Sequence, residues 1–325
     1  MQKSLSSLTL ISMVSLTAVL TAQAQNTASD SLNYAPGNAV IATEGTGGTG
    51  WGSAWNSKSD TTTVVLSQVL AGSLGYTDGS GNTLSTSGGS LVSSTVNGTA
   101  AQPQRALSST FGTLAAANTT AAGTLWMSYL WQGLNTTGSG SGLYRQATMM
   151  FITGATSGAG TGSERLDIGM PNISAANQAT ILPNVSLWSS GGIAGQTVLA
   201  ASPLQSTVAA NNGYTTFVLV EMIMDNTSTT ADTMYVWLNP TLTGATPVGS
   251  PNLTYAGQDL SVLNGIRIQS GNLNPTFGSV GGAQQVDEIN FGYTPLDVEA
   301  VPEPASMALV ALSGLALLAL KRKQS

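Results

Sequence analysis

Short apolar runs separated by clusters of Gly, Asn, Ser, Thr and Asp fill most of the chain, a pattern typical of strands joined by turns. Helical periodicity is nearly absent, and only residues 113–122 and 174–180 are candidates for short helices. The run at 216–224 is apolar on both faces except at Glu221, which predicts a central strand covered on both sides. The sequence therefore predicts an all-β fold. Its clearest strand patterns lie at residues 62–69, 125–131, 147–153, 165–169, 216–224, 233–238, 265–269 and 288–293.

Only 7% of the 325 residues are charged, and the chain contains neither histidine nor cysteine. The lack of these two residue types excludes disulfide bonds, thiolate chemistry and Ser-His-Asp mechanisms. We therefore expect a protein without enzymatic activity. Nucleic acid is excluded as a partner because binding it requires lysine and arginine to neutralise phosphates. The basic residues between the two terminal segments are Lys58, Arg105, Arg145, Arg165 and Arg267.

The N-terminal segment has the features of a signal peptide. Lys3 supplies a positive charge, residues 8–20 form an apolar stretch, and Ala22-Gln23-Ala24 is a cleavage site of the A-x-A type. We expect signal peptidase to remove residues 1–24. Residues 25–296 then form a body of a size that one β-sandwich domain can occupy.

The C-terminal segment joins a proline-rich tetrapeptide to an apolar stretch. Val301, Pro302, Glu303 and Pro304 precede the apolar residues 305–320. As a helix this stretch covers roughly 24 Å, a minimal transmembrane span for a hydrocarbon core of roughly 30 Å. Residues 297–300 are predicted to link the body to this tail. The sequence thus predicts a single C-terminal transmembrane helix.

A basic stop at residues 321–325 follows the apolar stretch, with Lys321, Arg322 and Lys323 as its charged residues. Positive charge after a span favours a cytoplasmic C-terminus and places the body on the far side of the membrane. The arrangement of residues 301–325 resembles the PEP-CTERM sorting signal of exported bacterial proteins. The resemblance implies recognition by an exosortase. It also implies an exported protein that is anchored in the membrane at least transiently, and then lies at the cell surface or in the extracellular matrix.

The body has a series of landmark segments at residues 34–37, 47–55, 72–76, 88–90, 105–107, 126–130, 165–169, 235–240 and 286–289. The order of these landmarks resembles that in the concanavalin A-like, laminin-G-type domains. This resemblance implies a two-sheet antiparallel jelly-roll sandwich, in agreement with the strand pattern. Glycosidases share that fold, but the Glu-x-Asp-x-Glu pattern that sets their carboxylates on one strand face is absent here.

Trp51 and Trp55 adjoin the Gly-rich segment 45–50. No helical pattern follows this segment, so we interpret it as a flexible loop rather than a dinucleotide-binding turn. Two indole rings on such a loop suit stacking on sugar rings, as in a carbohydrate-binding module for exopolysaccharide. The alternative, which we favour, is that both rings cover one end of the core, because tryptophan buries a large area.

Four acidic residues are candidate Ca²⁺ ligands, namely Asp225, Asp232, Asp287 and Glu288. The first two flank a predicted hairpin turn, and the last two are adjacent on a strand, where neighbouring side chains point to opposite faces. Hard cations need oxygen ligands from several loops, whereas acidic residues are also common in turns and at strand edges. We favour the latter interpretation and assign no cofactor or metal.

The sequence as a whole predicts a non-enzymatic exported protein of the cell surface or extracellular matrix. A carbohydrate-binding module is the first alternative. A glycan hydrolase is a weaker one, with Glu221 and Glu288 as its best candidate carboxylates.

Overall fold

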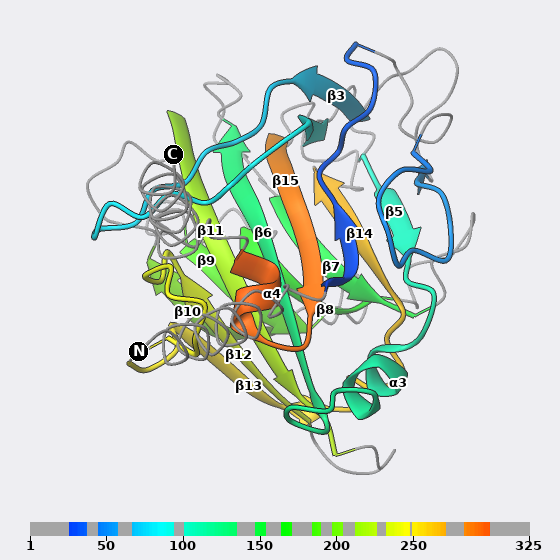
Figure 1. Cartoon of the computed structure of the whole chain (residues 1–325), viewed down its shortest axis with the longest axis vertical. Helices are drawn as coiled ribbons and strands as arrows, with labels where there is room; N and C mark the ends of the chain where they lie inside the picture. The colour runs from blue at the N-terminus through cyan, green and yellow to red at the C-terminus, as the bar shows by residue number, and fades with distance from the viewer. Residues whose placement is uncertain are drawn as a thin grey trace, which may run out of the picture.

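The structure is a computed structural model, and within its described residues the chain forms two antiparallel β-sheets and two short helices (Figure 1). The prediction of an all-β fold with two antiparallel sheets is therefore confirmed. No helix among the described residues is long and apolar enough to cross a membrane. Both predicted terminal segments, 1–24 and 301–325, lie outside the described residues. The described ranges are 26–37, 45–57, 67–93, 101–134, 147–153, 164–170, 184–189, 197–203, 212–225, 232–247, 249–270 and 283–299.

The larger sheet has eight strands, all paired antiparallel. Its order is β13 (Leu253–Gln258), β12 (Asp232–Leu238), β11 (Asn212–Ile223), β6 (Thr124–Leu134), β15 (Ala283–Gly292), β4 (Gly89–Ser93) and β3 (Ser67–Ala71), with β1 (Asn26–Asp30) also paired to β15. The central strands β11, β6 and β15 are long, and the edge strands β13 and β3 are short. Short edge strands leave little unpaired backbone exposed to other chains.

The smaller sheet has seven strands and is also antiparallel. Its order is β10 (Thr197–Pro203), β9 (Asn184–Ser189), β8 (Glu164–Met170), β7 (Ala147–Ile152), β14 (Gly265–Ser270), β5 (Pro103–Ala106) and β2 (Asn56–Ser57).

The main hydrophobic core lies between the two sheets. Val218 and Val220 on β11 belong to it together with Met149 and Phe151 on β7. Phe111 lies at the start of helix α3 (Phe111–Ala116) and meets the Phe151 ring edge-on, with 5.9 Å between the ring centroids. Aromatic rings prefer this edge-to-face geometry, so α3 closes one end of the core.

A second core lies on the outer face of the larger sheet. Phe217 and Leu219, which alternate with the first-core residues of β11, belong to it. Strand β11 is thus a central strand covered on both faces, as its sequence predicts. Three segments cover this face, and we call them the covering layer: residues 72–88, which connect β3 to β4, residues 240–244, and helix α4 (Pro295–Glu299). Figure 1 shows α4 in front of this sheet. Their buried apolar side chains are Leu74, Tyr76, Leu84, Leu242 and Val298.

Some element boundaries differ from the sequence predictions. The predicted helix at 113–122 corresponds to α3, which begins at Phe111 because the hydroxyl of Thr110 caps it by accepting the N–H of Thr113. The predicted helix at 174–180 lies outside the described residues. The linker predicted at 297–300 belongs to α4 as far as Glu299.

Candidate functional site

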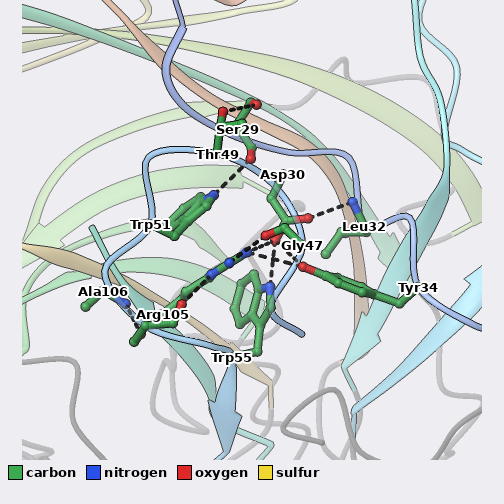
Figure 2. Close-up of polar contacts among 11 residues, drawn as sticks. Ser29, Asp30, Leu32, Tyr34, Gly47, Thr49, Trp51, Trp55, Arg105 and Ala106 are labelled. Atoms are coloured by element: carbon green, nitrogen blue, oxygen red, sulfur yellow. Dashed lines mark hydrogen bonds and ion pairs between the residues drawn. The ribbon is translucent and has the colours of Figure 1, made fainter. Parts of the chain in front are cut away.

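The Arg105 cluster, made of Asp30, Tyr34, Trp51, Trp55 and Arg105, joins the two sheets (Figure 2). Asp30 is the last residue of β1 in the larger sheet, and Arg105 lies on β5 in the smaller sheet. Their side chains form an ion pair between Oδ2 and Nη1, and each is only 2% exposed. A buried ion pair is stable only when its remaining hydrogen-bonding groups are also satisfied.

The cluster meets that condition around Asp30. Its Oδ2 accepts hydrogen bonds from the Tyr34 hydroxyl at 2.9 Å and from Trp55 Nε1 at 2.8 Å. Its Oδ1 accepts the backbone N–H of Leu32 at 2.9 Å. Burial, followed by the negative charge of Asp30, raises the pKa of Tyr34. Tyr34 therefore acts as a neutral donor to the carboxylate.

The hydrogen-bond donors of the Arg105 guanidinium also have partners. Its Nε donates to the carbonyl of Ser53 at 2.9 Å, and its Nη2 donates to the carbonyl of Gly47 at 2.6 Å. The guanidinium lies 4.7 Å from the centroid of the Trp51 ring, within cation–π range. The arginine thus fixes the Gly-rich segment onto the body, and this segment is a packed loop.

Two glycines allow this loop to approach β1 closely. Gly48 and Gly50 have φ of +78° and +74°, in the left-handed region. A Cβ at Gly50 would lie 1.9 Å from the carbonyl oxygen of Thr27. The close approach allows Trp51 Nε1 to donate to the carbonyl of Ser29 at 2.9 Å.

The two tryptophans have different environments. Trp55 is 1% exposed and belongs to the main core, so its ring does not offer a face to a sugar. Trp51 is half-buried, and its ring meets Phe291 edge-on at a centroid distance of 6.1 Å. Trp51 alone therefore stays a candidate for glycan contact.

Asp287 and Glu288 act as anchors for the covering layer. Asp287 Oδ2 accepts the N–H of Leu74 at 2.7 Å, and Glu288 Oε1 accepts the N–H of Ser87 at 2.5 Å. These two bonds hold the two ends of the segment 72–88. Glu288 has φ of +48° at a register shift between β15 and β6. This bulge breaks the alternation of side chains, so the expectation that the two acids serve opposite faces is wrong.

Burial raises the pKa of these carboxyls. Desolvation, followed by the charge of Glu288, raises the pKa of Asp287 to about 8, although the N–H groups of Leu74 and Glu288 partly offset this. Desolvation likewise raises the pKa of Glu288 to about 7. Both anchors are therefore partly protonated near neutral pH.

Glu299 and Asp78 are further anchors that the sequence analysis did not single out. Glu299 Oε2 accepts the N–H of Gly244 at 2.5 Å, and desolvation raises its pKa to about 7. Asp78 Oδ2 accepts the N–H of Leu242 at 2.8 Å. Desolvation alone would raise the pKa of Asp78, but hydrogen bonds from Asn82, Leu242 and Ser80 outweigh it and lower the pKa. The turn composition of residues 78–82 was the available signal for Asp78.

The other two calcium candidates lie at strand ends: Asp225 follows β11, and Asp232 begins β12. Asp232 Oδ1 accepts the N–H of Asp225 at 3.1 Å, and its Oδ2 accepts the N–H of Leu260 at 2.6 Å. Among the described residues, no group of three or more acidic side chains gathers in a way that would hold a metal ion. The structure therefore does not bring Asp225 or Asp232 together with Asp287 and Glu288 in such a group. Calcium binding stays the alternative that the sequence analysis did not favour.

Glu221 lies opposite Trp126 on β6 and Tyr235 on β12. It is half-buried, and desolvation raises its pKa. Its nearest strand neighbours are thus aromatic residues.

A family model, described as the PEP-CTERM protein-sorting motif, matches residues 300–323. The chain carries a PEP-CTERM sorting motif. This confirms the resemblance of the tail and marks an exported protein that an exosortase sorts. The sorting motif includes Val301, Pro302, Glu303, Pro304 and the basic residues Lys321, Arg322 and Lys323, all outside the described residues.

No curated protein matches the sequence. Among solved structures, an alginate lyase, Aly36B, is 11% identical with a TM-score of 0.47, over 82% of this chain and 95% of that one. An endo-β-1,4-glucuronan lyase from the fungus Trichoderma reesei is 12% identical with a TM-score of 0.42, over 78% and 94%. The Ca²⁺- and mannose-bound exoplasmic/lumenal domain of VIP36 is 11% identical with a TM-score of 0.37, over 73% and 82%. Likenesses this weak identify neither a ligand nor a reaction.

Proposed function

We propose that the protein is a non-enzymatic cell-surface or extracellular-matrix component. Its body is a concanavalin A-like jelly-roll module, and its PEP-CTERM tail delivers that body through the membrane. The observation that carries this proposal is the sorting motif at residues 300–323, which follows directly on a folded body that ends at Glu299. Signal peptidase and an exosortase are the expected processing partners.

The use of the carboxylates supports a structural role for the body. Glycoside hydrolysis needs two carboxylates that face the substrate about 5–10 Å apart. Asp287, Glu288 and Glu299 instead accept backbone N–H groups of the covering layer. We expect the unchanged body to release no reducing ends from polysaccharides. Any hydrolysis by the unchanged body would contradict the non-enzymatic proposal, and its loss in Glu221→Gln or Glu288→Gln would assign the reaction to that carboxylate.

Replacing Pro302, Glu303 and Pro304 together by alanine is expected to leave the C-terminal peptide attached. The physical reason is that the sorting enzyme loses the segment that it recognises, while the folded body stays unchanged. Intact mass and membrane fractionation of the product check this result, and a strain without exosortase should give the same product. Pro251→Ala, in a described segment outside the motif, is the matched control and should be processed normally. Loss of the peptide from the triple variant would contradict the sorting assignment.

A carbohydrate-binding role is a second candidate, and it is favoured by Trp51, which is only half-buried. If a polysaccharide stacks on this ring, Trp51→Ala is expected to weaken binding by about 0.5–1.5 kcal/mol, or up to about tenfold. Calorimetry with the purified body, with and without Ca²⁺, measures the change. Tyr235→Ala, at another half-buried aromatic residue, is the control. The carbohydrate-binding role is ruled out if the unmodified body binds no polysaccharide on a glycan array.

A further inference from the structure

One end of the outer face of the larger sheet lies beyond the second core. Strands β6, β11, β12 and β13 lie side by side there in this order (Figure 1). Leu219 belongs to the second core, and Glu221 and Ile223 follow it on the same face of β11. Ile223 is 41% exposed, so the cover ends between Leu219 and Ile223. We call this surface the open end, made of the half-buried or exposed residues Glu221, Ile223, Thr233, Tyr235, Thr254 and Ala256.

Aromatic residues flank Glu221 where the open end meets the second core. Strand register places Trp126 on β6 and Tyr235 on β12 directly opposite Glu221. The Trp237 ring stacks on the Trp126 ring with 5.9 Å between the centroids, and its centroid lies 6.1 Å from that of Tyr235. Trp126 and Trp237 are only 3% and 7% exposed, whereas Tyr235 is half-buried. Tyr235 is therefore the ring of this group that a molecule outside the protein can contact.

The fold leaves two polar groups of this region without a partner. Desolvation raises the pKa of Glu221, and no hydrogen bond or positive charge from the described part of the chain offsets that rise. The buried acids Asp287, Glu288 and Glu299 differ, because each accepts a backbone N–H. The indole N–H of Trp237 is buried and has no acceptor among the described residues. Both unpaired groups cost folding free energy, so stability does not explain why the chain has them.

The chemistry of the open end matches an uncharged sugar. A sugar ring has an apolar face that can pack on an aromatic ring, and Tyr235 offers such a ring. Its hydroxyl groups both donate and accept hydrogen bonds, and a carboxylate accepts them with charge-assisted strength. A sugar acid is disfavoured because its negative charge would meet the Glu221 carboxylate. An ammonium ligand would pair with Glu221 but would offer no acceptor to the Trp237 N–H.

We propose that the open end binds an uncharged sugar residue of a polysaccharide. The Tyr235 ring packs against the sugar ring, and the Glu221 carboxylate accepts hydrogen bonds from the sugar hydroxyls. A lone carboxylate suits binding rather than hydrolysis, which needs two carboxylates that face the substrate. The inference rests on the proposed function, because an exported body meets polysaccharides outside the cell. It adds the class of sugar and a binding surface other than Trp51.

The test begins with full-length exported protein on an array of uncharged hexose oligosaccharides, with alginate oligosaccharides as the acidic comparison. We expect binding to an uncharged oligosaccharide and at least about tenfold weaker binding to alginate. Calorimetry with the best-bound oligosaccharide then compares the variants. Glu221→Leu is expected to weaken binding at least about tenfold, and Tyr235→Ala roughly tenfold. Tyr235→Phe keeps the ring and should lose less than Tyr235→Ala. Val262→Ala, at a residue 45% exposed, is the control and should bind like the unchanged protein.

Urea unfolding of the same variants separates a binding role of Glu221 from a structural one. Glu221→Leu removes a half-buried carboxylate that has no partner, so its free energy of unfolding should be equal to that of the unchanged protein or higher. Weaker sugar binding in a variant that is at least as stable is the result expected of a binding residue. Weaker binding together with a lower free energy of unfolding would show a structural role and overturn the proposal.

Other results would also overturn binding at the open end. These are no binding to any uncharged oligosaccharide, equal or tighter binding to alginate, and unchanged affinity in both Glu221→Leu and Tyr235→Ala. Binding that falls in Trp51→Ala but not in Tyr235→Ala would place the sugar at Trp51 instead. A dimer that dissociates in Glu221→Leu would assign the open end to a second copy of the chain.

Replacement of Pro302, Glu303 and Pro304 by alanine separates this inference from the proposed function. If the C-terminal peptide is still removed from that variant, the sorting assignment fails, while sugar binding by the open end is measured independently. If removal requires the motif and no uncharged sugar binds, only the open-end site fails.

Discussion

Replacing Arg105 by methionine is expected to destabilise the folded body by about 3–5 kcal/mol. The change leaves the Asp30 carboxylate buried without its cation, and it also releases the carbonyls of Ser53 and Gly47. The Gly-rich loop should then detach from β1, which exposes Trp55 to solvent. Urea unfolding followed by tryptophan fluorescence measures both effects.

Two further variants make this expectation specific to the cluster. Val262→Ala, at a residue 45% exposed, should change the free energy of unfolding by less than about 0.5 kcal/mol. The double variant Asp30→Asn with Arg105→Met should cost less than the sum of the single changes, because it removes both charges of one ion pair. A cost below about 1 kcal/mol for Arg105→Met would show that the ion pair does not hold the sheets together.

The free energy of unfolding is expected to fall as the pH rises from about 4 to about 8. Asp287, Glu288 and Glu299 have folded-state pKa values raised to about 8, 7 and 7 from ordinary values of 3.8, 4.5 and 4.5. Between the ordinary and the raised values the folded chain keeps protons that the unfolded chain has released. Stability from these groups is therefore complete below the ordinary pKa and is lost as the pH passes the raised pKa. The loss is at most about 1.4 kcal/mol per pH unit for each group, measured by urea unfolding at several pH values.

Glu288→Gln is the decisive variant for this pH dependence. Its amide oxygen can still accept the N–H of Ser87, while its titration is removed. We expect a shallower pH dependence and a higher stability at pH 8 than in the unchanged chain. Val262→Ala, at a residue 45% exposed, removes no titratable group and should leave the pH dependence unchanged. A stability that rises between pH 5 and 8 would contradict the assigned burial of these carboxyls.

Local patterns predicted part of the candidate site. The apolar residues on both faces of 216–224 correctly predicted that β11 is an interior strand of the larger sheet. This pattern lies within one short segment, so it can be read from the sequence. The same reasoning was wrong for Asp287 and Glu288, since it assumed a regular strand and could not foresee the bulge at Glu288. It placed Glu299 in a linker because no local pattern shows that α4 packs on the sheet.

The sorting signal of this protein and the all-β character of its body could be predicted from the sequence alone. The sorting motif is a contiguous segment, and strands follow from the spacing of nearby side chains. The folded structure was needed to show which acids bind which loops, and that Trp55 is buried while Trp51 is half-buried. The bond between Leu74 and Asp287 joins residues 213 positions apart. Such contacts depend on how the sheets and the covering layer pack together, and spacing along the chain does not encode them.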